Sequence, residues 1–193
     1  MTMTTMMPSA RPEIGRHAAE AILHAAGVDI AKPAILGRRG YYRDTLGLPG
    51  VNDRGIYDDA ILVVTPTVYA TFNANTDPSG SGGRLATLAA GLWSYKLGTH
   101  HPDTPKAYPC LVQAAPVTVH RDNGVTERGE FYIHIHRGGY GTTGSEGCQT
   151  IHPDQWDAFF ALVKGEMQRY QLATIPYLLT EREPASETVP TAP

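Results

Sequence analysis

The sequence predicts a mainly β protein of the α+β class, with one helix near each end of a single domain. The chain has 193 residues, a length that suits one domain. Its middle contains short apolar runs, several with alternating polarity, separated by turn residues, a pattern typical of strands. Segments 14–27 and 152–171 instead repeat their apolar residues at helical spacing.

Composition narrows the class of protein. Hydrophobic residues make up 41% and charged residues 18%, which is typical of a globular domain that can bury a core without disulfides or metal. The net charge of −3 and the lack of a dense Lys/Arg stretch exclude a nucleic-acid partner. No apolar run is long enough for membrane insertion, and two cysteines make no disulfide framework. The sequence contains no pattern from which the oligomeric state can be predicted.

The two ends differ from the rest of the chain. Residues 1–11 are polar and lack a basic region followed by an apolar core, so no signal peptide is predicted. We therefore expect synthesis in the cytoplasm, and any export by a route that needs no signal peptide. Residues 1–11 and the Pro-rich tail 181–193 are predicted to be flexible. Segment 12–58 is predicted to pack on the main domain, 59–180.

The N-terminal segment begins with the first predicted helix. Its apolar residues are Ile14, Ala18, Ile22 and Ala25. Gly27 offers a stop signal. Segment 34–60 is rich in Gly, Asp and Pro and is predicted to form loops around one short strand. Within it, Asp58–Asp59 is interpreted as a pair of polar turn residues and Tyr41–Tyr42 as packing residues.

The main domain follows with strands, a loop and a helix. Strands are predicted over 60–64 and 68–74, and a flexible loop over 75–84. Further strands are predicted over 91–98, 111–122 and 130–137, with a turn at Asp122–Asn123–Gly124. The helix over 152–171 has Pro153 in its first turn, and a last strand is predicted over 173–179.

Two histidines, a glycine-rich loop and a cysteine form the segment most suggestive of chemistry. Alternation in strand 130–137 places His134 and His136 on one face. Residues 137–148 then contain five glycines in twelve positions and end at Cys148. Backbone N–H groups of such a loop favour a thiolate and can stabilise an oxyanion. A histidine on the strand before the loop can take the thiol proton.

His136–Arg137–Gly138 followed by Ser145–Glu146–Gly147–Cys148 resembles the active-site signature of the L,D-transpeptidase family. That signature is a His-Gly strand end, a variable loop and Ser-X-Gly-Cys. The resemblance is specific over residues 131–163. It implies a β-sandwich-like catalytic domain over 59–180 and a cysteine acyl-enzyme that acts on peptidoglycan stem peptides.

Carried over by position, the resemblance assigns roles to five residues. Cys148 is the expected nucleophile and His136 its base. Ser145 is expected to brace the loop, and the N–H groups of Gly147 and Cys148 to line an oxyanion hole. His134 is expected to orient His136 or the substrate. No cofactor or metal is expected for such an enzyme.

Substrate contacts are expected from residues around this unit, namely Arg137, Gln149, Tyr140 and His101. Lys96 and Arg137 are the basic residues best placed for a substrate carboxylate. This chain departs from the family at Gln149 and Thr150, where the family has an apolar residue and then Arg or Asn. Hydrolysis and transfer to an amine therefore both stay open. The pattern is most similar to divergent phage and effector members, which implies action in the periplasm or cell wall.

Two alternatives remain open. In the first, His134 and His136 are ligands of a zinc-dependent hydrolase. The set could be completed by His100, His101, Asp103, Cys148 or His152. The sequence contains no HExxH and no paired CxxC motifs, which are the stronger zinc signals. In the second, the domain is a non-catalytic virion or wall-binding module. Cys110, within an apolar run, is expected to be a buried small residue.

Overall fold

The computed structural model describes residues 14–42, 46, 48, 52–83 and 85–181. Among them, its elements are α1 (Arg16–Ala25), β1 (Ala34–Arg39), β2 (Asp59–Val64), β3 (Tyr69–Asn75), β4 (Ala86–Leu88), β5 (Gly91–His100), β6 (Tyr108–Gln113), β7 (Val117–Arg121), β8 (Thr126–Gly129), β9 (Ile135–Arg137), β10 (Gln149–Ile151), α2 (Pro153–Arg169) and β11 (Ile175–Glu181). The expectations of flexibility for 1–11 and 182–193 concern residues outside this description. Glu181, assigned to the tail, is the last residue of β11.

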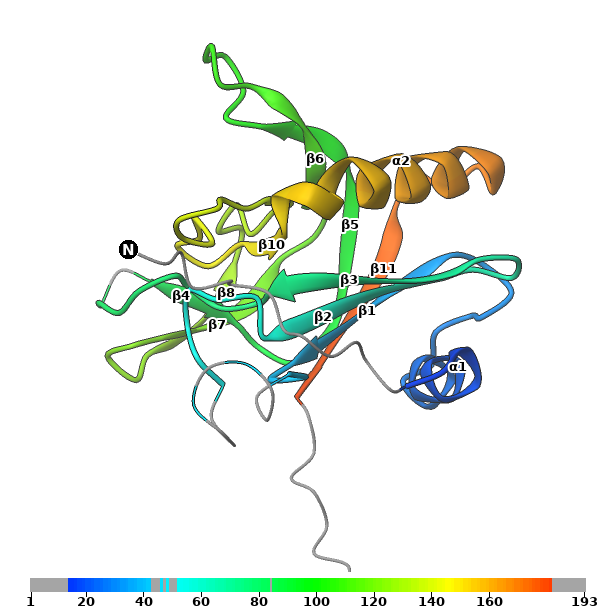
Figure 1. Cartoon of the computed structure of the whole chain (residues 1–193), viewed down its shortest axis with the longest axis horizontal. Helices are drawn as coiled ribbons and strands as arrows, with labels where there is room; N and C mark the ends of the chain where they lie inside the picture. The colour runs from blue at the N-terminus through cyan, green and yellow to red at the C-terminus, as the bar shows by residue number, and fades with distance from the viewer. Residues whose placement is uncertain (1–13, 43–45, 47, 49–51, 84, 182–193) are drawn as a thin grey trace, which may run out of the picture.

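The prediction of a mainly β chain with a helix near each end is confirmed (Figure 1). Eight strands form a closed barrel in the order β1-β11-β5-β6-β9-β10-β3-β2, and β4, β7 and β8 form a separate sheet. The pairs β1/β11 and β9/β10 are parallel, and the other pairings are antiparallel. The larger sheet thus closes on itself instead of forming a sandwich with a second large sheet.

The core explains why β2 is apolar from Ala60 to Val64. Ile61 and Val63 belong to the main core cluster, whereas Leu62 and Val64 belong to a second cluster with Leu23 of α1. Both faces of β2 are therefore covered, and all six of its residues are buried. A strand buried on both faces reads as a continuous apolar run. The predicted packing role of Tyr42 is confirmed, since it lies buried in the second cluster.

Helix α2 lies across the opposite side of the barrel from α1 and contacts β3, β9 and β10 (Figure 1). Pro153 occupies its first turn, as predicted, and His152 caps it because Nδ1 accepts the Asp154 N–H at 3.3 Å. Its buried face includes Trp156 and Phe159. No helix in the described part of the chain is both long and apolar enough to cross a membrane.

Several predicted strand boundaries are wrong. The run 111–122 is two strands, β6 and β7, interrupted before Pro116, which cannot donate to a ladder. Segment 126–129, which lies between two predicted strands, is β8, whose residues carry no apolar signal. In segment 130–137 only 135–137 is strand. The short strand β4 was not predicted.

The interpretation of Asp58–Asp59 as turn residues is also wrong, because both side chains are fully buried. Asp59 accepts hydrogen bonds from the Gly40 N–H and from the N–H and hydroxyl of Thr76. Arg39, also buried, lies 3.2 Å from an oxygen of Asp77. We call Arg39, Asp58, Asp59 and Asp77 the carboxylate cluster.

Burial sets the protonation of this cluster. It raises the pKa of Asp58 and of Asp59, and the proximity of other carboxylates raises both further. Arg39 opposes this rise at Asp59. One oxygen of Asp58 accepts the Asp53 N–H at 2.9 Å, while the other, Oδ1, has no partner in the described structure. Asp58 is therefore the member that most readily keeps its proton.

Candidate active site

Strand register brings the candidate residues onto one outer face of the barrel. Leu111 of β6 pairs with Ile135 of β9, and these two side chains point into the core. Their neighbours along each strand therefore face the other side of the sheet, where Cys110 still packs against the main core cluster. We call this set the histidine face: His100, Tyr108, Cys110, His134, His136 and Cys148.

The prediction that His134 and His136 share a face is confirmed, because the ring of His100 contacts both. Its centroid lies 5.3 Å from that of His134 and 4.0 Å, in a stacked arrangement, from that of His136. His100 ends β5 and pairs with Tyr108 on β6, in the hairpin that projects from the barrel in Figure 1. The cluster thus joins residues from three neighbouring strands.

Cys148 lies at the end of the glycine-rich loop, one residue before β10. Its Sγ accepts the His134 N–H at 3.4 Å and donates to the Tyr132 carbonyl at 3.4 Å. The Ser145 hydroxyl donates to the Cys148 carbonyl at 2.6 Å and accepts the Gly147 N–H at 2.9 Å. Ser145 therefore ties the loop together around the cysteine.

Two glycines of this loop are required by close approach of other atoms. Gly147 has a φ of 153°, and a Cβ there would meet the Ala86 carbonyl oxygen. A Cβ on Gly138 would meet the Tyr57 hydroxyl, and the Thr143 carbonyl oxygen at 3.0 Å. Only glycine fits at these two positions, so these glycines reflect close packing around the loop. A Cβ at Gly141 or Gly144 would meet nothing within 4 Å.

His136 is held in one tautomer. Its Nδ1 lies 2.8 Å from the Arg137 carbonyl oxygen, which can only accept, so Nδ1 carries the hydrogen. The Tyr108 hydroxyl lies 3.1 Å from the same Nδ1 and donates to the Arg137 carbonyl at 3.3 Å. Burial, together with His100, lowers the pKa of His136 to about 3. The ring is therefore neutral at physiological pH, with a lone pair on Nε2.

Cys148 does not match the expectation of a resting thiolate. Burial raises the pKa of its thiol to about 11, the His134 N–H offsets this only in part, and Glu146 raises it further. The Gly147 N–H is directed at Ser145. In the described structure no hydrogen bond joins Sγ to a histidine ring; catalytic hydrogen bonds often tighten only when substrate binds.

The predicted substrate-binding residues divide into two groups. Arg137, Tyr140 and His101 are exposed. The Arg137 guanidinium lies 5.1 Å from the Tyr108 ring centroid, and the Tyr140 hydroxyl donates to Asp154 at 2.6 Å. Gln149 is a correction, because its side chain is fully buried and accepts the Tyr177 hydroxyl at 2.9 Å inside the barrel. It cannot reach a substrate.

A groove of about 380 Å³ adjoins the histidine face at His134. Its lining includes Lys96, an expected contact, and two residues that the sequence did not single out, Glu130 and Tyr132. Tyr132 is 78% exposed and has a φ of 56°, an uncommon backbone conformation for a bulky residue. Glu130 and Tyr132 could have been proposed as lining residues from the sequence, because they lie just before His134 in the chain.

For the metal alternative, the structure groups a different set of potential ligands from the one predicted. His136 belongs to no group of three potential ligands in the described structure, and its Nδ1 faces a carbonyl. His134 instead lies with His100 and Cys110, and one ligand atom of each falls within 4.8 Å of the others. His152 caps α2. Cys110 is buried, as predicted.

No protein-family model, curated protein or solved structure matches the chain.

Proposed function

We propose that this chain is a cysteine acyl-enzyme that acts on peptidoglycan stem peptides, with Cys148 as nucleophile and His136 as base. The observation that carries the proposal is the 2.8 Å hydrogen bond between His136 Nδ1 and the Arg137 carbonyl. It leaves Nε2 of a neutral ring as the acceptor, on the same face as Cys148. A base oriented by a third group beside a nucleophile is the general pattern of covalent catalysis.

The protonation states of Cys148 and His136 before substrate binds determine how the first step proceeds. The pKa of Cys148 is raised and that of His136 is lowered, so a preformed thiolate–imidazolium pair is disfavoured. The thiol proton therefore passes to His136 Nε2 as Sγ attacks the substrate carbonyl. The oxyanion that forms accepts the Cys148 N–H, which has no other partner among the described residues.

The acyl-enzyme then completes the reaction. His136 returns the proton to the leaving amine, and the bond between the carbonyl carbon and nitrogen breaks, which leaves a thioester on Cys148. Water hydrolyses this thioester, or an acceptor amine attacks it to form a new peptide bond. In both cases the thiol regains its proton and His136 returns to the neutral tautomer that Arg137 holds.

The groove supports an extended peptide substrate that carries charges of both signs. Lys96 can meet a carboxylate and Glu130 an amine, while exposed Tyr132 offers an apolar ring. A stem peptide with a D-centre next to meso-diaminopimelate has these groups. The proposal includes an L,D-transpeptidase-like catalytic domain of the phage or effector type, acting in the periplasm or cell wall.

Purified muropeptides test the proposal. Wild-type protein is expected to yield shortened or cross-linked products by mass spectrometry, and to carry a thioester adduct of the matching mass. Cys148→Ala is expected to give neither, and His136→Gln to lose about a thousandfold in rate. His120→Ala, an exposed histidine on β7, serves as the control and keeps full activity.

Product formation by Cys148→Ala would contradict the proposal. Loss of activity on chelation, with activity retained after thiol alkylation, would instead favour the zinc hydrolase. A folded wild type that binds peptidoglycan but forms no product and no adduct would favour the non-catalytic module.

A further inference from the structure

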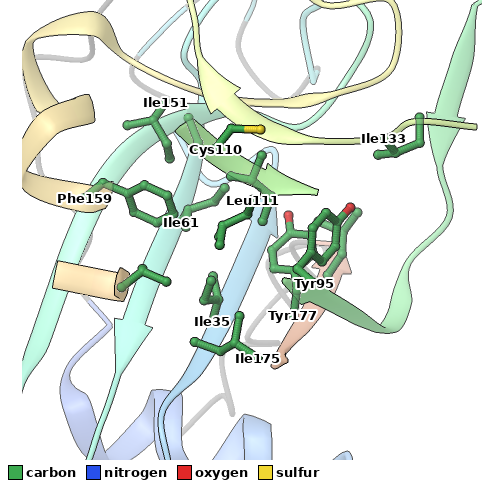
Figure 2. Close-up of a cluster of buried hydrophobic side chains, with 14 of the residues drawn as sticks. Ile35, Ile61, Tyr95, Cys110, Leu111, Ile133, Ile151, Phe159, Ile175 and Tyr177 are labelled. Carbon is green, nitrogen blue, oxygen red and sulfur yellow. The ribbon is translucent and has the colours of Figure 1, made fainter. Parts of the chain in front are cut away.

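Three side chains beside the proposed catalytic pair converge, and none of them is the nucleophile or the base of that chemistry. His100 Nδ1 and His134 Nδ1 are 3.0 Å apart, and Cys110 Sγ lies 3.9 Å from His134 Nδ1. All three potential ligand atoms fall within 4.8 Å of one another. Figure 2 shows Cys110 at the margin of the buried cluster, above Leu111 and well away from Ile35 and Ile175.

These separations are close to those around a tetrahedral metal ion. A zinc ion with bonds of about 2.1 Å to nitrogen and about 2.3 Å to sulfur separates its ligand atoms by about 3.3–3.6 Å. The nitrogen pair is slightly closer than this, at 3.0 Å, and one nitrogen–sulfur pair slightly farther apart, at 3.9 Å. The third separation, between His100 and Cys110, is at most 4.8 Å. Side-chain movements of about 1 Å would bring all three to one ion.

The backbone holds the three ligands on neighbouring strands. His100 and Cys110 lie on the paired strands β5 and β6, and His134 immediately precedes β9, which pairs with β6. Cys110 is fully buried, His134 is 8% exposed, and His100 is half-buried. Rigid strands therefore supply a preformed site that is covered on one side and reachable on the other.

The two imidazole rings contact each other through their Nδ1 atoms, at 3.0 Å. In that contact one Nδ1 carries the hydrogen and the other offers a lone pair. No carboxylate in the described structure forms an ion pair with either ring.

We propose that His100 Nδ1, Cys110 Sγ and His134 Nδ1 form a binding site for one soft divalent cation of the zinc class, with water as the fourth ligand. Two imidazoles and a thiolate suit zinc and exclude magnesium and calcium, which prefer oxygen ligands. Three protein ligands with one open position characterise zinc sites that exchange a ligand.

Metal binding requires two proton movements. The Cys110 thiol releases its proton to solvent, because the thiolate is the ligand. The hydrogen now shared between His100 Nδ1 and His134 Nδ1 moves to Nε2 of the same ring, which frees both Nδ1 lone pairs. Binding of one ion therefore releases one proton.

Cobalt(II) titration of the full chain tests the site, since tetrahedral cobalt bound to a thiolate gives visible ligand-field bands and a near-ultraviolet sulfur-to-metal band. The wild type is expected to bind one equivalent, with both features, and equimolar zinc is expected to displace it. Cys110→Ser is expected to lose the sulfur band, and His100→Ala to bind at least about tenfold more weakly. Cys148→Ser tests the other thiol and is expected to keep the band.

Loss of the band in Cys148→Ser, or its persistence in Cys110→Ser, would overturn the assignment. X-ray absorption of the zinc-loaded wild type needs no variant to fold. One sulfur with two imidazoles in the first shell is expected, and a shell without sulfur would overturn the site. Neither measurement uses muropeptides, so the outcome is independent of the proposed enzymatic activity.

Discussion

The histidine face and the carboxylate cluster bury titratable groups in opposite ways. On the histidine face the ring of His100 contacts the rings of both His134 and His136. His134 and His136 stay neutral because burial lowers their pKa values. In the carboxylate cluster Asp77 and Asp59 lie near Arg39, Asp58 adjoins Asp59, and burial raises the pKa of Asp58 and Asp59. The first region is a set of unprotonated bases, and the second is an incompletely neutralised set of acids.

This difference gives the two regions opposite contributions to stability against pH. Histidines with a lowered pKa bind fewer protons in the folded state, so stability is lost as pH falls below about 6.5. Aspartates with a raised pKa bind more protons in the folded state, so stability is lost as pH rises above about 4. The following variants test each side, in order of expected effect.

Arg39→Met should have the largest effect, because it leaves the buried Asp59 and Asp77 without their cation. We expect a loss of about 3–5 kcal/mol in the free energy of unfolding, measured in urea at pH 7. Arg54→Met is the matched control, since Arg54 and Asp122 form a partly exposed pair at 2.7 Å, for which about 0–1 kcal/mol is expected. Equal losses for the two variants would show that the cluster is not held by Arg39.

His136→Gln should make the free energy of unfolding depend less on pH in the acid range, below about 6.5. The folded pKa of His136 is lowered to about 3, so the wild type loses stability as pH falls from about 6.5 toward that value. Glutamine cannot titrate, and we expect the variant to avoid about 2–3 kcal/mol of the loss between pH 7 and pH 4. Urea unfolding at the two pH values measures this, with His120→Ala as control. An unchanged pH dependence in this range would mean that His136 is solvated in the folded state.

Asp58→Asn should make the free energy of unfolding depend less on pH above about 4. The pKa of Asp58 is raised, so the wild type loses stability as pH rises from about 4 toward about 8. Asparagine keeps an oxygen for the Asp53 N–H and removes the titration, so a flatter slope is expected, by at least about 1–2 kcal/mol at pH 8. Thermal unfolding between pH 5 and pH 8 measures the slope. Asp122→Asn, at the surface pair with Arg54, should leave this slope unchanged.

Tyr108→Phe should have the smallest effect. It removes a hydroxyl that lies 3.1 Å from His136 Nδ1 and 3.3 Å from the Arg137 carbonyl. We expect a loss of about 1 kcal/mol of stability, with the tautomer of His136 retained because its bond to Arg137 remains. Nitrogen NMR of the ring reads the tautomer directly. A shift of the hydrogen to Nε2 would show that Tyr108, and not Arg137, selects the tautomer.

The same two regions show what sequence can predict. The shared face of His134 and His136 followed from alternation, which is local. The position of Gln149 could have been found in the same way, because it alternates with the buried Ile151 and points inward. It was misassigned because the family resemblance directed attention to that position as a substrate contact.

Other features could not be predicted because they depend on strand pairing between distant segments. Cys110 meets His134 only because β6 pairs with β9, through the single register pair Leu111 and Ile135. Asp59 is buried because Gly40 and Thr76, both distant in the chain, donate to it. Aspartates beside Gly-rich segments are common in turns, so local composition gave the wrong answer.

The parallel pair β9 and β10 has one more consequence, for protein engineering. Parallel strands are ordinarily joined through a helix, but here only residues 138–148 make the connection. Tyr140, Gly141 and Thr142 at its tip are exposed, whereas strand register fixes the two ends. The tip is therefore a natural insertion point for loop libraries, where new binding specificities can be selected without moving the thiol or the imidazole.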